Sequence, residues 1–259
     1  MDGVVNLGET PIPGAAAAIT ALQNAGRAVY FLTNNSSRSR AHYVQKLARF
    51  GVVTEPRFVY TSAYATALYL VSKGGVGKTV FIVGEHGLAE ELEAAGLKVV
   101  LAADDEPYTQ IDYVVVGIDS AFTYAKLRYA HAAITRGHAE LIATNRDSTY
   151  PTENGEIPGG GSIVASVATA AGREPITIGK PEPYGLELIL RDAGATVDQA
   201  DVVGDRLDTD IAAGNRLGVS TTLVLTGVTS REMAADPINP LWRPTRIVGT
   251  LAEILEDIS

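Results

Sequence analysis

The stretch "ADVVGDRLDTDIAAGNRLG" (residues 200–218) decides the fold of this chain of 259 residues. The apolar residues Val202 and Val203 lead into a loop with three aspartates, and residues 209–217 have the pattern of a helix. A short apolar run without polar alternation is typical of a strand buried on both faces. The stretch therefore predicts a strand, an acidic loop and a helix, which is the repeating unit of a parallel α/β sheet.

The same unit recurs in both directions from this stretch. Apolar runs such as "AVYFLTNN", "TVFIVG", "YVVVGI", "ELIAT" and "STTLVL" predict further buried strands. Helical patterns separate them, with Pro and Gly near the expected helix ends. Helices are predicted at residues 13–26, 39–50, 62–72, 86–95, 124–136, 163–171 and 184–193. The pattern predicts an α/β fold with a doubly wound parallel sheet.

Composition excludes several functional classes. The 21 basic and 30 acidic residues give a net charge of −9, which disfavours nucleic acid and anionic membranes as partners. The chain has no cysteine, so disulfides, thiolate catalysis and zinc–thiolate sites are excluded. No apolar run has membrane-spanning length and nothing resembles a signal peptide, so we expect a cytoplasmic protein.

Four stretches lie where predicted strands end: "MDGVV" (1–5), "FLTNN" (31–35), "IGKPEP" (178–183) and "VVGDRLDTD" (202–210). In doubly wound sheets, chemistry takes place on the loops at the carboxyl ends of strands. Clustered carboxylates suit Mg²⁺, whereas a hydroxyl, backbone N–H groups and a lysine suit phosphate oxygens. Each stretch alone also fits an ordinary turn, helix cap or solvated surface. Their combination predicts one site, with the candidates Asp2, Thr33, Asn34, Lys180, Asp205 and Asp210.

The order of DGV, TN, KP and GDxxxxD resembles the haloacid dehalogenase (HAD) superfamily of phosphatases. Longer strings such as "FLTNNSSRSR", "IPGGGSIVASV" and "TIGKPEP" resemble its subfamily with a C2-type cap, the NagD-like and p-nitrophenylphosphatase-like enzymes. The resemblance implies a Rossmann-like core interrupted by an α/β cap domain. We place the core at residues 1–77 and 176–259 and the cap at 78–175, since the two motifs that flank this segment lie far apart in the sequence.

The resemblance also implies roles for the charged residues. Asp2 would be the general acid and base, and its backbone carbonyl would be a ligand of Mg²⁺. Asp205 would bind the metal directly, and Asp210 would be a nearby or water-mediated metal partner. Lys180 would neutralise the nucleophile and the phosphate in a pocket crowded with carboxylates.

Further residues would contact the substrate. By the same resemblance, Thr33 and the backbone around Asn34 would bind the transferring phosphoryl group, and Asn35 would touch the substrate. The loop "TNRDSTYPTENG" (144–155) of the cap is expected to discriminate among substrates, with Arg146 and Tyr150 as candidates.

The implied function is Mg²⁺-dependent hydrolysis of small-molecule phosphate monoesters through an aspartyl-phosphate intermediate. Sugar phosphates, glycerol phosphate, phosphoglycolate, nucleotides, pyridoxal phosphate and p-nitrophenyl phosphate are all candidate substrates. A cap that closes over the site favours a small phosphorylated metabolite over a phosphoprotein. A homodimer formed through the cap is also expected.

The first motif of the family is D-x-D-G-V, and the sequence departs from it. Met1 stands at the variable position, so the nucleophilic aspartate and the apolar strand before it would precede Met1. We expect the natural chain to carry both upstream. The alternative is a non-catalytic homologue that binds phosphometabolites without the nucleophile. A receiver-type signalling domain is disfavoured by the long insertion and by the late GDxxxxD motif.

Overall fold

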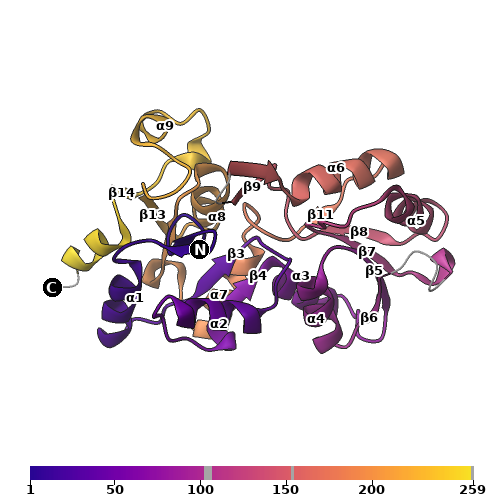
Figure 1. Cartoon of the computed structure of the whole chain (residues 1–259), viewed down its shortest axis with the longest axis horizontal. Helices are drawn as coiled ribbons and strands as arrows, with labels where there is room; N and C mark the ends of the chain where they lie inside the picture. The colour runs from indigo at the N-terminus through magenta and orange to yellow at the C-terminus, as the bar shows by residue number, and fades with distance from the viewer. Residues whose placement is uncertain (102–106, 153–154, 258–259) are drawn as a thin grey trace.

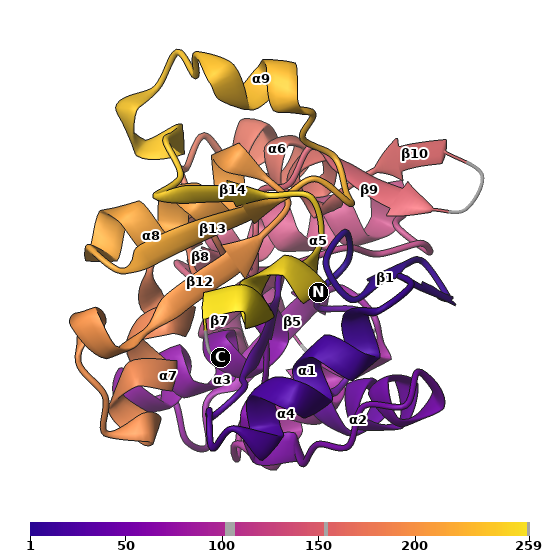
Figure 2. The same cartoon turned by 90° about the vertical axis from the view of Figure 1, so that its left-hand side faces the viewer.

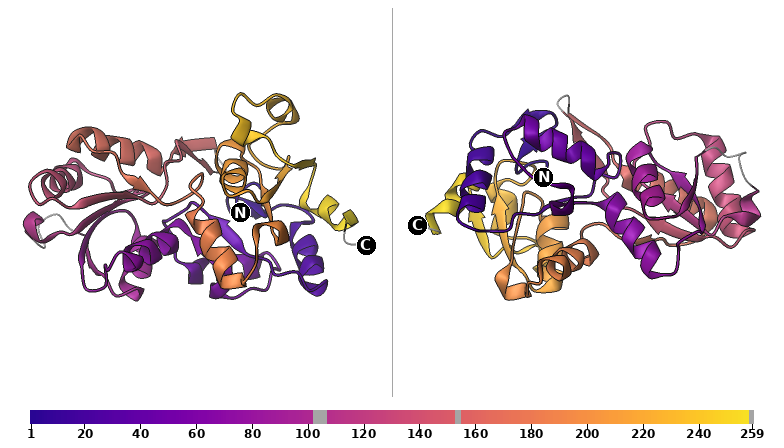
Figure 3. Two further views of the ribbon diagram at one scale, coloured as in Figure 1. Left: turned by 180° about the vertical axis from the view of Figure 1, so that it is seen from behind. Right: turned by 90° about the horizontal axis from the view of Figure 1, so that it is seen from below.

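The computed structural model describes residues 1–101, 107–152 and 155–257, and it shows two α/β lobes side by side (Figure 1). The view from below in Figure 3 separates the lobes clearly along the long axis of the molecule. One lobe contains both ends of the chain and is called the core. The other is built mainly from the middle of the chain and is called the cap.

The cap is built on five parallel strands in the order β11–β8–β7–β5–β6. Successive side chains point to opposite faces: Val80 and Ile82 of β5 pack against α3 and α4, whereas Phe81 and Val83 pack against α5 and α6. Both faces are therefore covered, which explains the apolar runs without alternation. The elements are α3 (Ser62–Ser72), β5 (Thr79–Val83), α4 (His86–Ala94), β6 (Lys98–Val100), β7 (Tyr113–Val116), α5 (Tyr124–Thr135), β8 (Glu140–Ala143), α6 (Gly160–Ala171) and β11 (Ile176–Thr177).

The two lobes share residues at their border. Strand β11 pairs with β8, so residues 176–177, placed in the core by the sequence, form the edge of the cap sheet. Helix α3 lies before residue 78 but packs on the same sheet. Tyr60 and Leu188 of the core belong to the same apolar cluster, so α3 joins the two lobes. The division at 78 and 175 stays a prediction, with α3 and β11 as shared elements.

The core strands form two parallel groups, β3–β4 and β12–β13–β14. Figure 2 shows the second group with the N-terminus beside it. Within the described residues no backbone pairing joins the two groups. One apolar cluster spans them, with Phe31 and Val59 from the first and Val224 and Val248 from the second. The elements are α1 (Ala15–Asn24), β3 (Phe31–Thr33), α2 (Arg40–Arg49), β4 (Val59–Thr61), α7 (Tyr184–Ala193), β12 (Asp201–Gly204), α8 (Ala212–Leu217), β13 (Ser220–Val224), α9 (Arg231–Ala235) and β14 (Arg246–Val248).

Two antiparallel hairpins complete the structure, and the sequence did not predict them. The first is β1 (Asn6–Leu7) with β2 (Thr10–Pro11), directly after the first motif. The second is β9 (Thr149–Thr152) with β10 (Gly155–Pro158), in the stretch expected to be a substrate loop. Short 3₁₀ turns lie at Pro56–Phe58, Tyr108–Gln110, Val197–Gln199, Pro240–Trp242 and Leu251–Asp257.

The predicted fold class is confirmed. Helices α3 and α7 have the bounds predicted from the sequence, whereas the helix predicted at 209–217 starts as a π-helical turn, Leu207–Ile211, before α8. Across the described residues, no helix combines the length and the apolar character needed to cross a membrane.

Candidate active site

The strand-end loops bring a buried ion pair together. Lys180 follows β11, and its Nζ lies 2.5 Å from Oδ1 of Asp210, in the turn after β12. Their side chains are only 9% and 10% exposed. Burial alone would lower the pKa of Lys180, but the Asp210 carboxylate raises this pKa above its usual value. Burial would likewise raise the pKa of Asp210, yet Lys180 lowers it, so both groups are charged at neutral pH.

Asp205 is a buried carboxylate with an excess of negative charge around it. A Cβ atom at Gly3 would lie 2.2 Å from its Cγ, and one at Gly227 would lie 2.1 Å from its Oδ2, so only glycine fits at both positions. The N–H of Val228 donates to Asp205 at 2.9 Å. Burial and the neighbouring Asp210 raise the pKa of Asp205 to about 6. An additional cation beside Asp205 would offset the repulsion between the negative charges of Asp205 and Asp210.

Asp2 is held by its own hairpin. The Nδ2 group of Asn6 donates to Asp2 Oδ1 at 2.6 Å and to the carbonyl of Gly8 at 2.8 Å. Asn6 is buried, and its Oδ1 atom has no hydrogen-bond partner among the described residues. Sequence reasoning did not identify Asn6, which orients the predicted acid–base residue.

The α-amino group of Met1 lies among the same charges. Burial and the charge of Lys180 lower its pKa, whereas three carboxylates act in the opposite direction: Asp210, Asp2 and Asp205. The α-amino group of Met1 therefore belongs to the same group of buried charges as Lys180 and Asp210.

The carboxylates do not form a ready-made metal cage. In the part of the chain that the structure describes, no three acidic, histidine or cysteine side chains could hold a metal ion by themselves. Asn6 holds Asp2, and Lys180 holds one oxygen of Asp210. Mg²⁺ is usually bound by one or two carboxylates together with water and substrate phosphate, so the donors present fit such a site.

The loop after β3 is the second half of the site. The Thr33 hydroxyl accepts the N–H of Asn35 at 3.2 Å. The Asn34 side chain donates to the carbonyl of Lys180 and accepts its N–H, both at 2.8 Å. Asn34 therefore positions Lys180 with its side chain, while its backbone carbonyl accepts a hydrogen bond from the Ser62 hydroxyl at 2.6 Å. Binding of a phosphate by the backbone around Asn34 stays a prediction.

Asp147 is a further residue that sequence reasoning missed. Both of its carboxylate oxygens accept hydrogen bonds from Asn34 Nδ2, at 3.0 and 3.1 Å. Burial raises the pKa of Asp147, against the lowering effects of Asn34 and Lys180. The loop quoted as a substrate loop thus also supports the core through this carboxylate.

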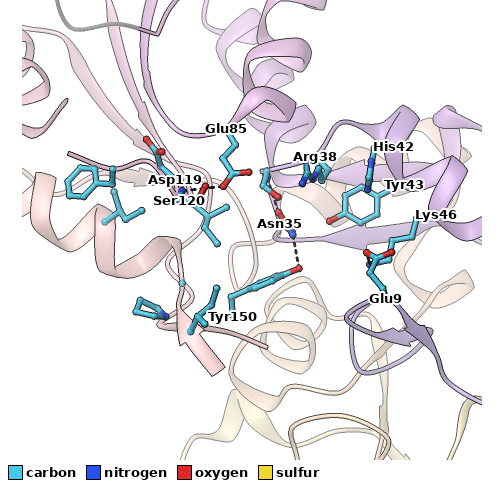
Figure 4. A pocket seen from close by; sticks show the side chains of 17 residues that line it. Glu9, Asn35, Arg38, His42, Tyr43, Lys46, Glu85, Asp119, Ser120 and Tyr150 are labelled. Carbon is cyan, nitrogen blue, oxygen red and sulfur yellow. Dashed lines mark hydrogen bonds and ion pairs between the residues drawn. The ribbon is translucent and has the colours of Figure 1, made fainter. Parts of the chain in front are cut away.

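A cavity of about 470 Å³ lies between cap and core, and the loop after β3 reaches it through Asn35 (Figure 4). Asn35, Tyr43 and Tyr150 line it, and Asn35 Nδ2 donates to the Tyr150 hydroxyl at 3.1 Å. Burial and the Asp2 charge raise the pKa of Tyr150 to about 12, so its hydroxyl is neutral. The same two causes raise the pKa of Tyr43. The two phenols thus lie within the electrostatic reach of Asp2.

The structure does not bring Arg146 to this cavity. Its guanidinium pairs with Glu174 at 3.0 Å, and both side chains are largely exposed, at 47% and 80%. The contact of Arg146 with a substrate stays a prediction, but Arg146 is not among the residues that line the cavity. The physical reason is the direction of its side chain, which points out of the loop while Asp147 points in.

Comparison with known proteins identifies the chain. Residues 1–98 match the family described as haloacid dehalogenase-like hydrolase, and residues 177–254 match a HAD-hydrolase-like family. The chain belongs to the HAD superfamily of hydrolases. The core of this HAD hydrolase lies almost wholly within the two matched segments.

Its relatives are phosphatases. The chain is 40% identical over 249 residues to glycerol-3-phosphate phosphatase of Gallus gallus, covering 89% of this chain and 79% of that protein. Its fold matches p-nitrophenyl phosphatase from Archaeoglobus fulgidus with a TM-score of 0.90 and 35% identity, over 99% and 96% of the two chains. It matches a glycerol phosphate phosphatase from Mycobacterium tuberculosis in complex with magnesium with a TM-score of 0.87 and 37% identity, over 97% and 73%. The chain is a NagD-like HAD phosphatase, a phosphoric monoester hydrolase, as its motifs predicted.

The cap loop gives a first test of this HAD phosphatase. Tyr150→Ala is expected to change the ratio of kcat/KM between two natural phosphate esters by about fivefold or more. Turnover of p-nitrophenyl phosphate should change less, because contacts with the leaving group discriminate substrates while the core serves all of them. Arg146→Ala is the matched control on the same loop and should leave the ratio unchanged. An equal loss on every ester in Tyr150→Ala would show that Tyr150 does not determine specificity.

Proposed function

We propose that this HAD phosphatase hydrolyses small phosphate monoesters in a Mg²⁺-dependent reaction through an aspartyl phosphate. The observation that carries the proposal is the group of Lys180, Asp205, Asp210 and Asp2 around the α-amino group of Met1. The charge of Asp2 also reaches Tyr43 and Tyr150, which line a cavity between the lobes. A buried lysine can stabilise the negative charge of a phosphate dianion and of a carboxylate nucleophile, and buried carboxylates can bind a metal ion beside them.

The phosphoryl group is bound by the loop after β3 and by Lys180. The Thr33 hydroxyl and the backbone N–H groups that follow it can donate to phosphate oxygens. Lys180 is charged and fixed by Asn34 and Asp210, so its ammonium opposes the negative charge of the phosphate without moving.

Asp2 is the general acid and base. Its carboxyl group protonates the leaving-group oxygen and later accepts a proton from the water that attacks the phosphoenzyme. Asn6 holds one oxygen of Asp2, which leaves the other for the substrate. Tyr43 and Tyr150 lie within electrostatic reach of Asp2, which supports a leaving group bound in the cavity that they line.

Mg²⁺ would be held by Asp205, Asp210 and the backbone carbonyl of Asp2. The raised pKa of Asp205, caused by burial and by Asp210, supports a cation at this point. When bound, the metal ion would neutralise negative charge on the phosphoryl oxygens. The magnesium complex of the Mycobacterium tuberculosis relative gives independent support for this metal.

We propose that an aspartate placed directly before Met1 would act as the nucleophile. The position of the α-amino group supports this assignment, because a carboxylate one residue upstream would lie next to Lys180. We define the extended chain as the 259 residues preceded by a short apolar strand that ends in this aspartate.

A phosphate-release screen tests the proposed function. The extended chain, assayed with Mg²⁺ over the esters named above, is expected to release phosphate from at least one small metabolite and from p-nitrophenyl phosphate. Excess chelator should reduce the rate by about a hundredfold or more, because the charge of Asp205 and of the phosphate is then uncompensated. Full activity in chelator would refute the metal assignment, and no release from any ester would refute the proposed function.

A further inference from the structure

The cavity between the lobes contains more charge than the reaction uses, and most of it is paired. Glu9 pairs with Lys46 at 3.2 Å and with Arg49 at 3.0 Å. Asp119 pairs with Lys126 at 2.6 Å. Asp119 and Lys126 compensate each other, and Glu9 holds both of its cations in ion pairs, so none of these cations is free to turn toward a ligand.

Arg38 differs from these groups. Its guanidinium makes no hydrogen bond or ion pair with any residue that the structure describes, and its side chain is exposed where it lines the cavity. The nearby Arg40, in contrast, is fixed by two contacts. Its Nε lies 3.0 Å from Oε2 of Glu91, and its Cζ lies 3.5 Å from the centre of the Tyr64 ring. Arg38 is therefore a cation that is available to a ligand.

The backbone of Arg38 is nevertheless fixed. The N–H of Gly87, at the start of α4, donates to the carbonyl of Ser37 at 3.1 Å. A Cβ atom at Gly87 would lie 2.3 Å from Cα of Arg38, so the cap helix packs directly against this backbone. The guanidinium of Arg38 is therefore carried into the cavity by a backbone that packing holds in place.

Arg38 also lies at the phosphate end of the cavity. It comes three residues after Asn35 in the loop that would bind the phosphoryl group, and Figure 4 shows it beside Asn35, between Glu85 and His42. The pKa of Tyr150 depends on both Asp2 and Arg38. Burial raises this pKa most, the Asp2 charge raises it further, and the Arg38 charge lowers it. A leaving group beside Tyr150 in this cavity would therefore be influenced by the charges of both Asp2 and Arg38.

Glu85 contributes the opposite charge from the cap. Its Oε1 accepts the N–H of Ser120 at 3.2 Å, and it forms no ion pair in the described ranges. Glu85 repels anions on the cap side of the cavity, so a ligand anion is favoured on the side of Arg38 that faces away from Glu85.

Resting on the proposed function, we propose that Arg38 selects phosphate monoesters whose leaving group carries a carboxylate next to the ester carbon over esters of uncharged alcohols. Among the described residues that line the cavity, Arg38 is the arginine or lysine without an ion-pair partner, and one such cation matches one carboxylate. The probes are 2-phosphoglycolate for the first class and glycerol 3-phosphate for the second.

Equilibrium binding tests this inference. Dissociation constants of both esters are measured calorimetrically with the 259-residue chain and Mg²⁺, or as kcat/KM if the chain turns them over. Arg38→Gln is expected to reduce the preference for 2-phosphoglycolate about tenfold, as the loss of a charge-assisted hydrogen bond predicts. Arg38→Lys should keep part of the preference, and Glu85→Gln should increase it.

Arg128→Gln is the matched control, because it removes the same charge from an exposed arginine on the outer face of the cap. It should leave the preference unchanged. If the unsubstituted chain binds both esters, and Arg38→Gln and Arg128→Gln change the preference equally, the inference is wrong while the proposed function stands. If the 259-residue chain binds neither ester, the inference is wrong, and the phosphate-release screen with the extended chain decides the proposed function separately.

Discussion

Replacing Asp205 by asparagine is expected to abolish Mg²⁺-dependent phosphate release while stabilising the metal-free protein. Activity of the extended chain should fall on the order of a thousandfold, because a ligand charge is lost where metal and phosphate meet. The melting temperature should no longer rise when Mg²⁺ is added. Phosphate release and thermal unfolding, each with Mg²⁺ and with chelator, measure both effects.

The stabilisation follows from the pKa of Asp205. Burial and Asp210 raise this pKa from 3.8 to about 6, so ionised Asp205 costs the metal-free fold roughly 3 kcal/mol at pH 7. Below about pH 4 the carboxyl group is protonated in both folded and unfolded chains, and the cost disappears. The cost grows as the pH rises from 4 to 6. In chelator, Asp205→Asn should therefore melt several degrees above the parent at pH 7 and close to the parent at pH 4.

Asp208 offers a matched control, three residues further along the same turn. Its side chain is 46% exposed and pairs with Arg206 at 3.0 Å. Asp208→Asn should keep the Mg²⁺ response and most of the activity, because surface ion pairs contribute little. Wild-type-like activity in Asp205→Asn, or a loss of the same size in both variants, would contradict the assignment of Asp205.

Much of the fold could be predicted from the sequence because the parallel strands are short apolar runs between amphipathic helices. Helices α3 and α7 have their predicted bounds, since small and apolar residues face a buried sheet on one side. The hairpins β1–β2 and β9–β10 were missed because their strands are short and mostly exposed or polar. The short strand β6 was missed for a similar reason, since its first residue is exposed.

The border between the lobes could not be predicted from spacing. Strand β11 has two residues, and only its pairing with β8 assigns it to the cap sheet. The sequence shows that α3 is apolar but not that it packs on the cap sheet and on α7 together. These contacts depend on tertiary packing, which local pattern does not encode.

The site was predicted best where a residue follows a buried strand. Lys180 and Asp210 lie together as the motif order implied. The loop at 144–155 was harder, because neighbouring residues point in opposite directions. Arg146 turns outward to Glu174, and Asp147 turns inward to Asn34. The direction in which the Arg146 and Asp147 side chains point could not be predicted from the sequence of the loop.

The extended chain should be both more stable and active. The core strands form two groups, β3–β4 and β12–β13–β14, with no pairing between them in the described residues. A strand placed between β3 and β12 would add backbone hydrogen bonds to both edges. At about 1 kcal/mol for each hydrogen bond, a strand of about six residues would contribute on the order of 5 kcal/mol and raise the melting temperature by roughly 10 °C.

A second extended form separates the strand from the nucleophile. It carries the same added strand but ends in asparagine, which is similar in size to aspartate and cannot form the aspartyl phosphate. Both extended forms should melt well above the 259-residue chain. If neither does, the added strand does not pair with β3 and β12.

Phosphate release from p-nitrophenyl phosphate, with Mg²⁺, by these three forms tests the central claim most directly. The account predicts release by the form that ends in aspartate and a rate at least about a thousandfold lower for the asparagine form and for the 259-residue chain. Equal rates in the aspartate and asparagine forms would contradict it, because the residue next to Met1, beside Lys180, would then not be the nucleophile.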